Sequence, residues 1–117
     1  MAIFVQTDNP TRLVQDIKSY IDDKKIVTWM YDDDGDFTHD TDQWRYNAWI
    51  RPVIKKNDNQ VIFSILCRND RNLSVRDYAI YHGRFVEILL TYFDKLCIEI
   101  KVSPLATHYD SVVAHKR

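Results

Sequence analysis

The sequence VIFSILC, from Val61 to Cys67, is the strongest indication of a β-sheet in this chain. A strand with one covered face alternates apolar and polar residues, whereas this stretch is apolar at both odd and even positions. That pattern is typical of a central strand covered on two sides. We therefore expect residues 61–67 to lie inside a sheet that has at least one helix packed against it.

Two segments have the periodicity of amphipathic helices. The first follows a capping residue at Asp8 or Asn9, has Pro10 in its first turn and extends to about Asp23. The second begins at the capping-box sequence 74–77 and extends to about residue 93, with apolar residues three and four positions apart. Gly83 interrupts this second helix, and we expect it to permit close packing of a strand or a tyrosine side chain.

The remaining strands are predicted at residues 2–6, 26–32 and 96–102, and along an even-numbered apolar series from Trp44 to Ile54. Asp34-Gly35 is a dipeptide typical of two-residue hairpin turns. Such a turn pairs residues whose numbers sum to 69, for example Tyr31 with Thr38. An unbroken strand would then bury unpaired aspartates at a cost of several kcal/mol each. We therefore expect a bulge or loop between residues 40 and 43.

Together these patterns predict a single α+β domain over residues 1–117, with an antiparallel sheet of four to five strands packed by two helices and an irregular tail at 105–117. A chain of 117 residues with 45% hydrophobic content is long enough for one core. Cys67 and Cys97 lie on predicted strands and are expected to be reduced. The chain has neither a secretory signal pattern nor a long apolar run, so we expect a cytoplasmic protein without a membrane partner.

The strongest functional signal is a block of six aspartates between residues 32 and 42, which contains no lysine or arginine. The block carries −6 in a chain of net charge −1, which leaves +5 on the remaining residues. Tryptophan and tyrosine flank the block, as in interface hot spots with charged rims. The sequence therefore predicts a surface for a basic protein partner, made of Asp32, Asp33, Asp34, Asp36, Asp40, Trp29, Tyr31, Trp44 and Trp49.

Metal, nucleotide and nucleic-acid sites receive less support. The residue five positions before Gly35 is Met30, so the block does not match a calcium-binding EF-hand loop, and we expect no specific metal site. With two glycines in the chain there is no phosphate-cradling loop, and we expect no cofactor. The slightly negative net charge argues against a nucleic-acid partner.

An enzyme is the alternative reading. His39 and His82, with nearby aspartates, would be the acid and base of a small hydrolase or nuclease-like protein if they met in one pocket. His82 lies on the apolar stripe of the second helix, where a histidine is more often a hydrogen-bonded core residue. A homo-oligomeric structural domain, pairing through its terminal strand or through exposed aromatics, is a further alternative.

Two stretches, Trp29–His39 with the following Trp44 and Trp49–Pro52, and Tyr78–Glu87, resemble segments of small uncharacterised bacterial α/β proteins. In general type the chain is similar to immunity proteins of bacterial toxin systems, which are small, cytosolic, single-domain and locally acidic where they meet a basic toxin. That similarity implies an inhibitor of a basic partner such as a nuclease toxin, with no catalytic residues of its own.

Overall fold

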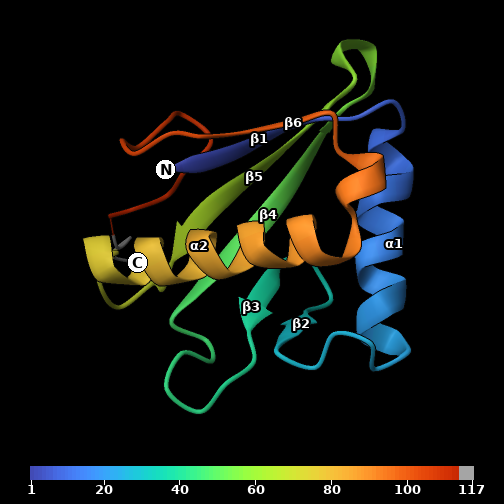
Figure 1. Cartoon of the computed structure of the whole chain (residues 1–117). Helices are drawn as coiled ribbons and strands as arrows, with labels where there is room; N and C mark the ends of the chain where they lie inside the picture. The colour runs from blue at the N-terminus through green and yellow to red at the C-terminus, as the bar shows by residue number, and fades with distance from the viewer. Residues whose placement is uncertain (114–117) are drawn as a thin grey trace.

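The apolar stretch forms the inner strand β5 (Gln60–Cys67), which lies between β4 (Ala48–Lys55) and β1 (Ala2–Gln6). The computed structural model describes residues 1–113, shown in Figure 1, and residues 114–117 of the expected tail lie outside the described part. Val61 through Ile65 are buried on both odd and even positions. The prediction of a central strand covered on two sides is confirmed.

Within residues 1–113 the sheet has six strands, which pair antiparallel with one another in the order β2-β3-β4-β5-β1-β6. The α+β class is confirmed, with one strand more than the upper expectation. No helix within residues 1–113 is both long and apolar enough to cross a bilayer. The other elements are α1 (Pro10–Asp22), β2 (Trp29–Tyr31), β3 (Phe37–His39), the 3-10 turn η1 (Lys56–Asp58), α2 (Val75–Tyr92), the 3-10 turn η2 (Asp94–Leu96) and β6 (Glu99–Val102).

The two helices begin at the expected caps. The Asn9 side chain accepts a hydrogen bond from the Arg12 amide at 3.1 Å, and the Ser74 hydroxyl accepts one from the Asp77 amide at 3.0 Å. α2 crosses the strands on one face of the sheet, and α1 stands beside it (Figure 1). Both helices contribute to one aromatic-rich core, in which the Phe85 ring of α2 lies 4.8 Å from the Phe63 ring of β5.

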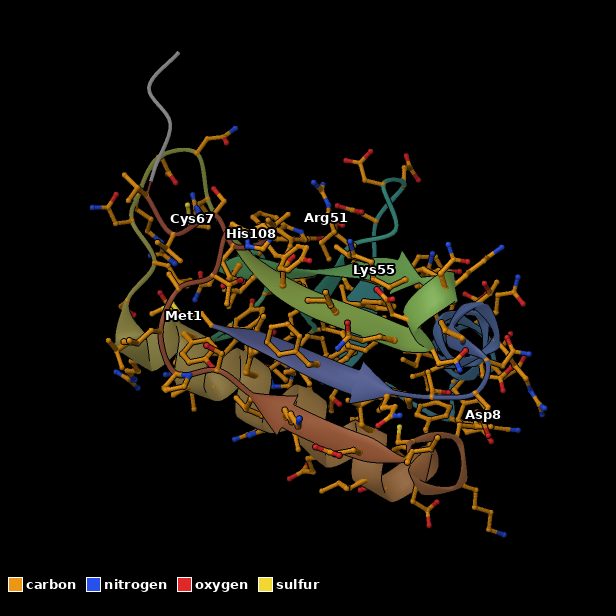
Figure 2. All side chains as sticks on the ribbon, turned by 90° about the horizontal axis from the view of Figure 1, so that it is seen from above. Met1, Asp8, Arg51, Lys55, Cys67 and His108 are labelled. Atoms are coloured by element: carbon orange, nitrogen blue, oxygen red, sulfur yellow. The ribbon has the colours of Figure 1, made fainter. Side chains whose placement is uncertain are left out.

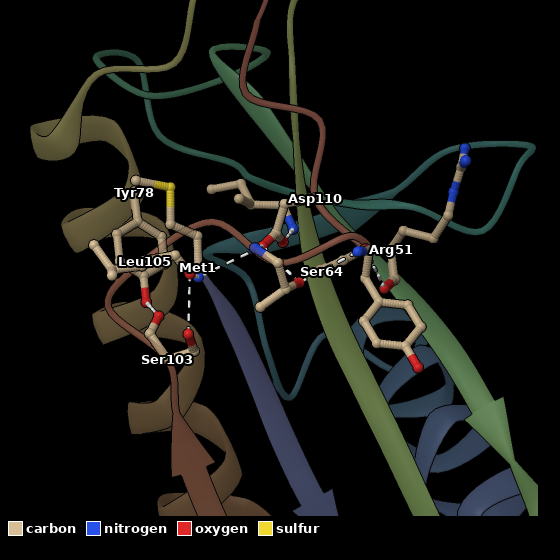
Figure 3. Close-up of polar contacts among 10 residues, drawn as sticks. Met1, Arg51, Ser64, Tyr78, Ser103, Leu105 and Asp110 are labelled. Carbon is tan, nitrogen blue, oxygen red and sulfur yellow. Dashed lines mark hydrogen bonds and ion pairs between the residues drawn. The ribbon is translucent and has the colours of Figure 1, made fainter.

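The chain after β6 returns to the sheet and is held there by Asp110. One carboxylate oxygen accepts the Ile65 amide at 2.9 Å, and the other accepts the Thr107 amide at 2.8 Å and lies 3.5 Å from the Met1 ammonium. Figure 3 shows Asp110 between Met1 and β5. Ser111 then forms a parallel bridge with Leu66, beyond Ser64, the last residue of β5 that pairs with β1. The described part of the tail is therefore irregular but anchored.

The predicted hairpin register is wrong by one residue. Tyr31 pairs with Phe37 and Trp29 with His39, so paired numbers sum to 68. The Gly35 amide donates to the Asp32 carbonyl at 2.9 Å, and the Asp32 amide donates to the Asp36 carbonyl at 3.0 Å. These bonds define a three-residue loop in which Gly35, at φ 82°, takes the left-handed position that follows a tight turn.

The expected break after Asp40 is confirmed, but it is longer than a bulge. Residues 40–47 form a loop, and β4 begins at Ala48. The extension of that strand back to Trp44 is therefore wrong. Trp44 is buried, whereas Tyr46 is exposed and has a φ of 62°, which lies outside the β region of regular strands.

Gly83 does not permit a close approach, so that expectation is also wrong. It is exposed on α2, and a Cβ built there would meet no described atom within 4 Å. Gly35 differs, because its φ is +82° and a Cβ would lie 3.0 Å from the Lys18 ammonium.

Replacing Gly83 by alanine should therefore stabilise the protein by about 1 kcal/mol, the helix-propensity difference between the two residues. Gly35→Ala is the matched control and should destabilise, because alanine is strained at positive φ. Chemical denaturation of the wild type and both variants measures the free energies of unfolding. A Gly83→Ala variant no more stable than the wild type would contradict the expectation that a methyl group fits at this position without steric cost.

Candidate functional site

The acidic hairpin, residues 32–36, joins β2 to β3 and is held in one conformation by its own backbone. The Asp32 carboxylate accepts the amides of Asp34 and Asp36, each at 3.0 Å. This aspartate thus satisfies two donors that the turn would otherwise leave open. The hairpin rises above the sheet face opposite α2, near the labelled Arg51 (Figure 2).

Asp36, the last residue of the hairpin, is neutralised by Arg51 of β4. The guanidinium donates two hydrogen bonds, from Nε at 2.9 Å and from an Nη at 2.7 Å. The Asp36 side chain is buried, and its hydrogen bond raises the pKa of Arg51. Asp36 is therefore a structural carboxylate that ties the hairpin to β4, and it is not a free contact for a partner.

A cleft of about 410 Å³ opens between the acidic hairpin and the end of β5. Its far side carries a second paired carboxylate, because Arg68 donates two hydrogen bonds of 2.9 Å to Asp70 and lowers the pKa of that carboxyl. The cleft residues come from three chain segments that the sheet brings together. They are Asp32, Asp34, Asp36, Trp49, Leu66, Cys67, Arg68, Asn69 and Asp70.

The aspartates of the block divide into paired and unpaired groups. Besides Asp36, Asp40 is paired, since its carboxylate lies 2.5 Å from Nε of Arg45, which also approaches Asp42 at 3.9 Å. The side chains at 32, 33 and 34 are exposed and form no ion pair with any residue from 1 to 113. The unpaired negative charge of the block is therefore concentrated at the hairpin tip.

The flanking aromatics divide in a similar way. Trp29 is 1% exposed and packs edge-on against the Phe85 ring at 5.1 Å, so it belongs to the core. Trp44 is also buried, with the Arg76 guanidinium 5.3 Å from its ring. Tyr31 is half-buried and donates its hydroxyl to Asp22 at 2.7 Å, which raises the pKa of Tyr31. Of the four expected anchors, only Trp49 lines the cleft.

Asp32, Asp34 and Asp36 can each direct one carboxylate oxygen to within 4.8 Å of the others. Both Asp36 oxygens bind the Arg51 guanidinium, and Asp32 already accepts two amides. A divalent cation at this point would share Asp36 with the positively charged Arg51 guanidinium, which would repel it. The three carboxylates are therefore better suited to a second guanidinium or ammonium group beside Arg51 than to a closed shell of oxygens around a metal.

The two histidines of the enzyme alternative lie in the core and share no ring contact. His39 is 2% exposed, packs against Trp29 at 4.8 Å and bonds the Thr28 carbonyl at 2.8 Å. His82 is equally buried and packs against Tyr78 at 4.6 Å, and neither of its ring nitrogens has a hydrogen-bond partner within residues 1–113. Burial lowers the pKa of His39, and that of His82 to about 4. Neither histidine lines the acidic cleft.

The far wall of the cleft was not predicted from the sequence. Residues 66–70 carry only a weak local signal, a polar run after an apolar strand. They reach the hairpin because β4 pairs with β5 in a register that sets Trp49 opposite Leu66. This pairing joins residues far apart in sequence, and no short-range pattern encodes it.

Comparison of the chain with protein-family models, with curated proteins and with solved structures finds no match.

Removing the cation that pairs with the buried Asp36 should destabilise the fold. Arg51→Met keeps the aliphatic stem but leaves the carboxylate without its two charged donors, and we expect a loss of about 2 kcal/mol. Arg45→Met removes the corresponding partner from the exposed Asp40 and should cost at most about 1 kcal/mol. Denaturant unfolding of the two variants measures the difference. Equal losses of unfolding free energy in the two variants would mean that the buried ion pair of Asp36 with Arg51 stabilises the fold no more than the exposed pair of Asp40 with Arg45.

His82 should make stability depend on pH. Its pKa is about 4 in the folded protein against 6.5 for a free histidine. The unfolded chain therefore binds a proton between these values while the folded one does not, so stability falls as the pH is lowered from about 6.5 to 4, by about 3 kcal/mol. His82→Leu should remove this contribution and make that part of the profile less steep, with the contribution of the buried His39 remaining. Unfolding free energies measured across the range test it, and identical slopes for both proteins would contradict it.

Proposed function

We propose that this protein is a small binding protein that docks a basic protein partner at the acidic hairpin. The observation that carries the proposal is the unpaired charge of Asp32, Asp33 and Asp34 at the hairpin tip, where Asp32 and Asp34 line the cleft. Most other carboxylates nearby already have an arginine, as Asp36, Asp40 and Asp70 do. A lysine or arginine from a partner would complete the same pairing at the tip.

The form of the cleft favours a cationic side chain over a free ion. Lysine and arginine place an aliphatic stem on apolar surface and keep the charged end in a polar environment. Trp49 and Leu66 offer such a surface, and the Asp32 and Asp34 carboxylates lie at its rim. The Tyr46 ring lies near Trp49, with 6.5 Å between the ring centroids. An indole face is in addition a favourable contact for a cation.

The hairpin is preorganised for this role. The backbone bonds of Asp32 fix the loop before a partner arrives, so docking would order few additional residues. Clustered charge of one sign at a protruding tip also accelerates encounter with a basic surface, and this acceleration decreases as salt increases. The expected behaviour is fast, salt-sensitive association in which Trp49 provides the apolar contact.

The more specific form of the proposal is an inhibitor of immunity type. A nuclease that binds phosphates presents clustered arginine and lysine, and aspartates spaced along a rigid loop can occupy the positions of phosphate groups. Such an inhibitor needs neither a cofactor nor catalytic residues. The buried positions of His39 and His82 are compatible with this form, since their rings face the core and not the hairpin.

The test begins with capture of basic proteins by the immobilised protein in an extract of its source cells, followed by kinetics with the purified partner. The variant Asp32→Asn/Asp33→Asn/Asp34→Asn should slow association at low salt by about tenfold or more and flatten its salt dependence. Trp49→Ala should instead accelerate dissociation, because it removes the apolar contact.

The matched control is Asp8→Asn/Asp58→Asn/Asp94→Asn, which removes the same charge from exposed positions outside the hairpin. It should associate nearly as fast as the wild type. The proposal fails if the hairpin variant and the control bind the partner at the same rate, or if all captured proteins bind equally well to the hairpin variant. A nuclease among the hairpin-dependent partners, inhibited by the wild type, would support the immunity form.

A further inference from the structure

β6 is the outer strand at one edge of the sheet, and β1 is its sole partner among the described strands. The Ser103 amide donates to the Ala2 carbonyl at 2.9 Å. In an antiparallel ladder the backbone groups of alternate residues face the same side. Lys101 and Glu99 therefore direct their amides and carbonyls toward β1, and those of Ile100 and Val102 are directed to the open edge. Figure 2 shows β6 at the margin of the sheet, with α2 beneath it.

Apolar side chains are exposed along this edge. Ile98 is 60% exposed, Val102 50% and Leu105 76%, all within eight residues of chain. Open edges with unpaired backbone groups are sites where a further strand can add. Charged residues on an edge normally discourage such addition, and β6 has two, Glu99 and Lys101. These two have opposite sign and lie on one face, with 3.2 Å between the Lys101 ammonium and the Glu99 carboxylate.

The sequence of β6 is complementary to itself. We infer that β6 pairs with β6 of a second copy of this chain, antiparallel about a two-fold axis at Ile100. In that register Glu99 of each copy faces Lys101 of the other. Ile98 lies at the end of the ladder opposite Val102, and its amide is already bonded to the Gln6 carbonyl at 2.8 Å. Ile100 lies in a hydrogen-bonded pair, so Glu99 and Lys101 fall at non-hydrogen-bonded positions, where side chains approach most closely.

Other registers are less favourable. A two-fold axis at Glu99 or at Lys101 sets two like charges directly opposite each other, which destabilises a strand pair. An axis at Ile100 is therefore the register in which both charged residues find a partner. The resulting interface combines a group of four alternating charges on one face with apolar residues on the face that is continuous with the core.

The opposite edge of the sheet does not offer the same possibility. β2 has three residues, and the hairpin that follows it carries the unpaired aspartates. Two copies that met at β2 would bring these carboxylates toward each other and repel. Charge thus favours self-pairing at β6 and opposes it at β2. The inference does not depend on the proposed function, because the hairpin takes no part in the β6 contact.

The dimer would be one sheet of twelve strands, since each copy contributes six. Its two acidic hairpins would lie near opposite ends, about 50 Å apart, given a spacing of about 4.8 Å between neighbouring strands. Two docking sites on one rigid body would strengthen binding to a partner that presents its basic surface twice.

Sedimentation velocity over a wide range of protein concentration tests the inference, and a concentration-dependent dimer is expected. Glu99→Lys or Lys101→Glu should each weaken the dimer by about tenfold or more, because both symmetric pairs become repulsive. The double variant Glu99→Lys/Lys101→Glu restores opposite charges in the same register and should dimerise like the wild type. Glu87→Lys, an equal charge change on the exposed face of α2, should have no effect.

Val102→Pro should abolish the dimer, because proline removes an amide that faces the open edge and leaves the bonds to β1 in place. Circular dichroism and thermal unfolding establish that each variant is folded. If Val102→Pro fails to fold, the charge-exchange series still decides. A monomer at every concentration overturns the inference, and so does a double variant as weak as the singles. The hairpin variant Asp32→Asn/Asp33→Asn/Asp34→Asn should retain the dimer, which separates this test from that of the docking site.

Discussion

The pairing of β4 with β5 positions both the core and the acidic cleft. Eight residues of each strand are paired without interruption, from Ala48 with Cys67 to Lys55 with Gln60. A slip of one residue would turn every β4 side chain to the other face of the sheet. Trp49 would leave the cleft, and Arg51 would leave Asp36. The core below the sheet and the acidic site above it are therefore fixed by the same register.

Sequence patterns predicted the elements that depend on periodicity and capping, and they were less successful where two local solutions were available. The Asp34-Gly35 dipeptide suits a two-residue turn, but a three-residue loop also places glycine at positive φ. Asp32 decides between them, because its carboxylate accepts the amides of both Asp34 and Asp36. The turn type thus followed from a side chain outside the dipeptide. A break between residues 40 and 43 was predicted because unpaired carboxylates exclude a continuous strand there, but the loop in the structure is longer and extends to residue 47.

The candidate site was predicted only in part, because a charged block looks uniform in sequence and is not uniform in space. Asp36 finds its arginine fifteen residues later in the chain, and this neighbour exists only once β3 and β4 are paired. Trp29 and Trp49 are equally aromatic, yet Trp29 faces the helices and Trp49 faces the cleft. Strand parity distinguishes such residues, but only after the register is known. What remained correct is the location of unpaired negative charge at the hairpin tip.

The two edges of the sheet differ in charge, and this difference has a consequence for assembly. An open edge can propagate without limit if it pairs with a different edge of the next molecule, which leads to fibres. Here β6 is complementary to itself. The β2 edge carries the carboxylates of the acidic hairpin, which repel the same edge of another copy. Pairing of β6 with β6 is isologous and uses up the complementary edge of both copies. Growth would therefore stop at two chains, with the acidic hairpins left free at the ends.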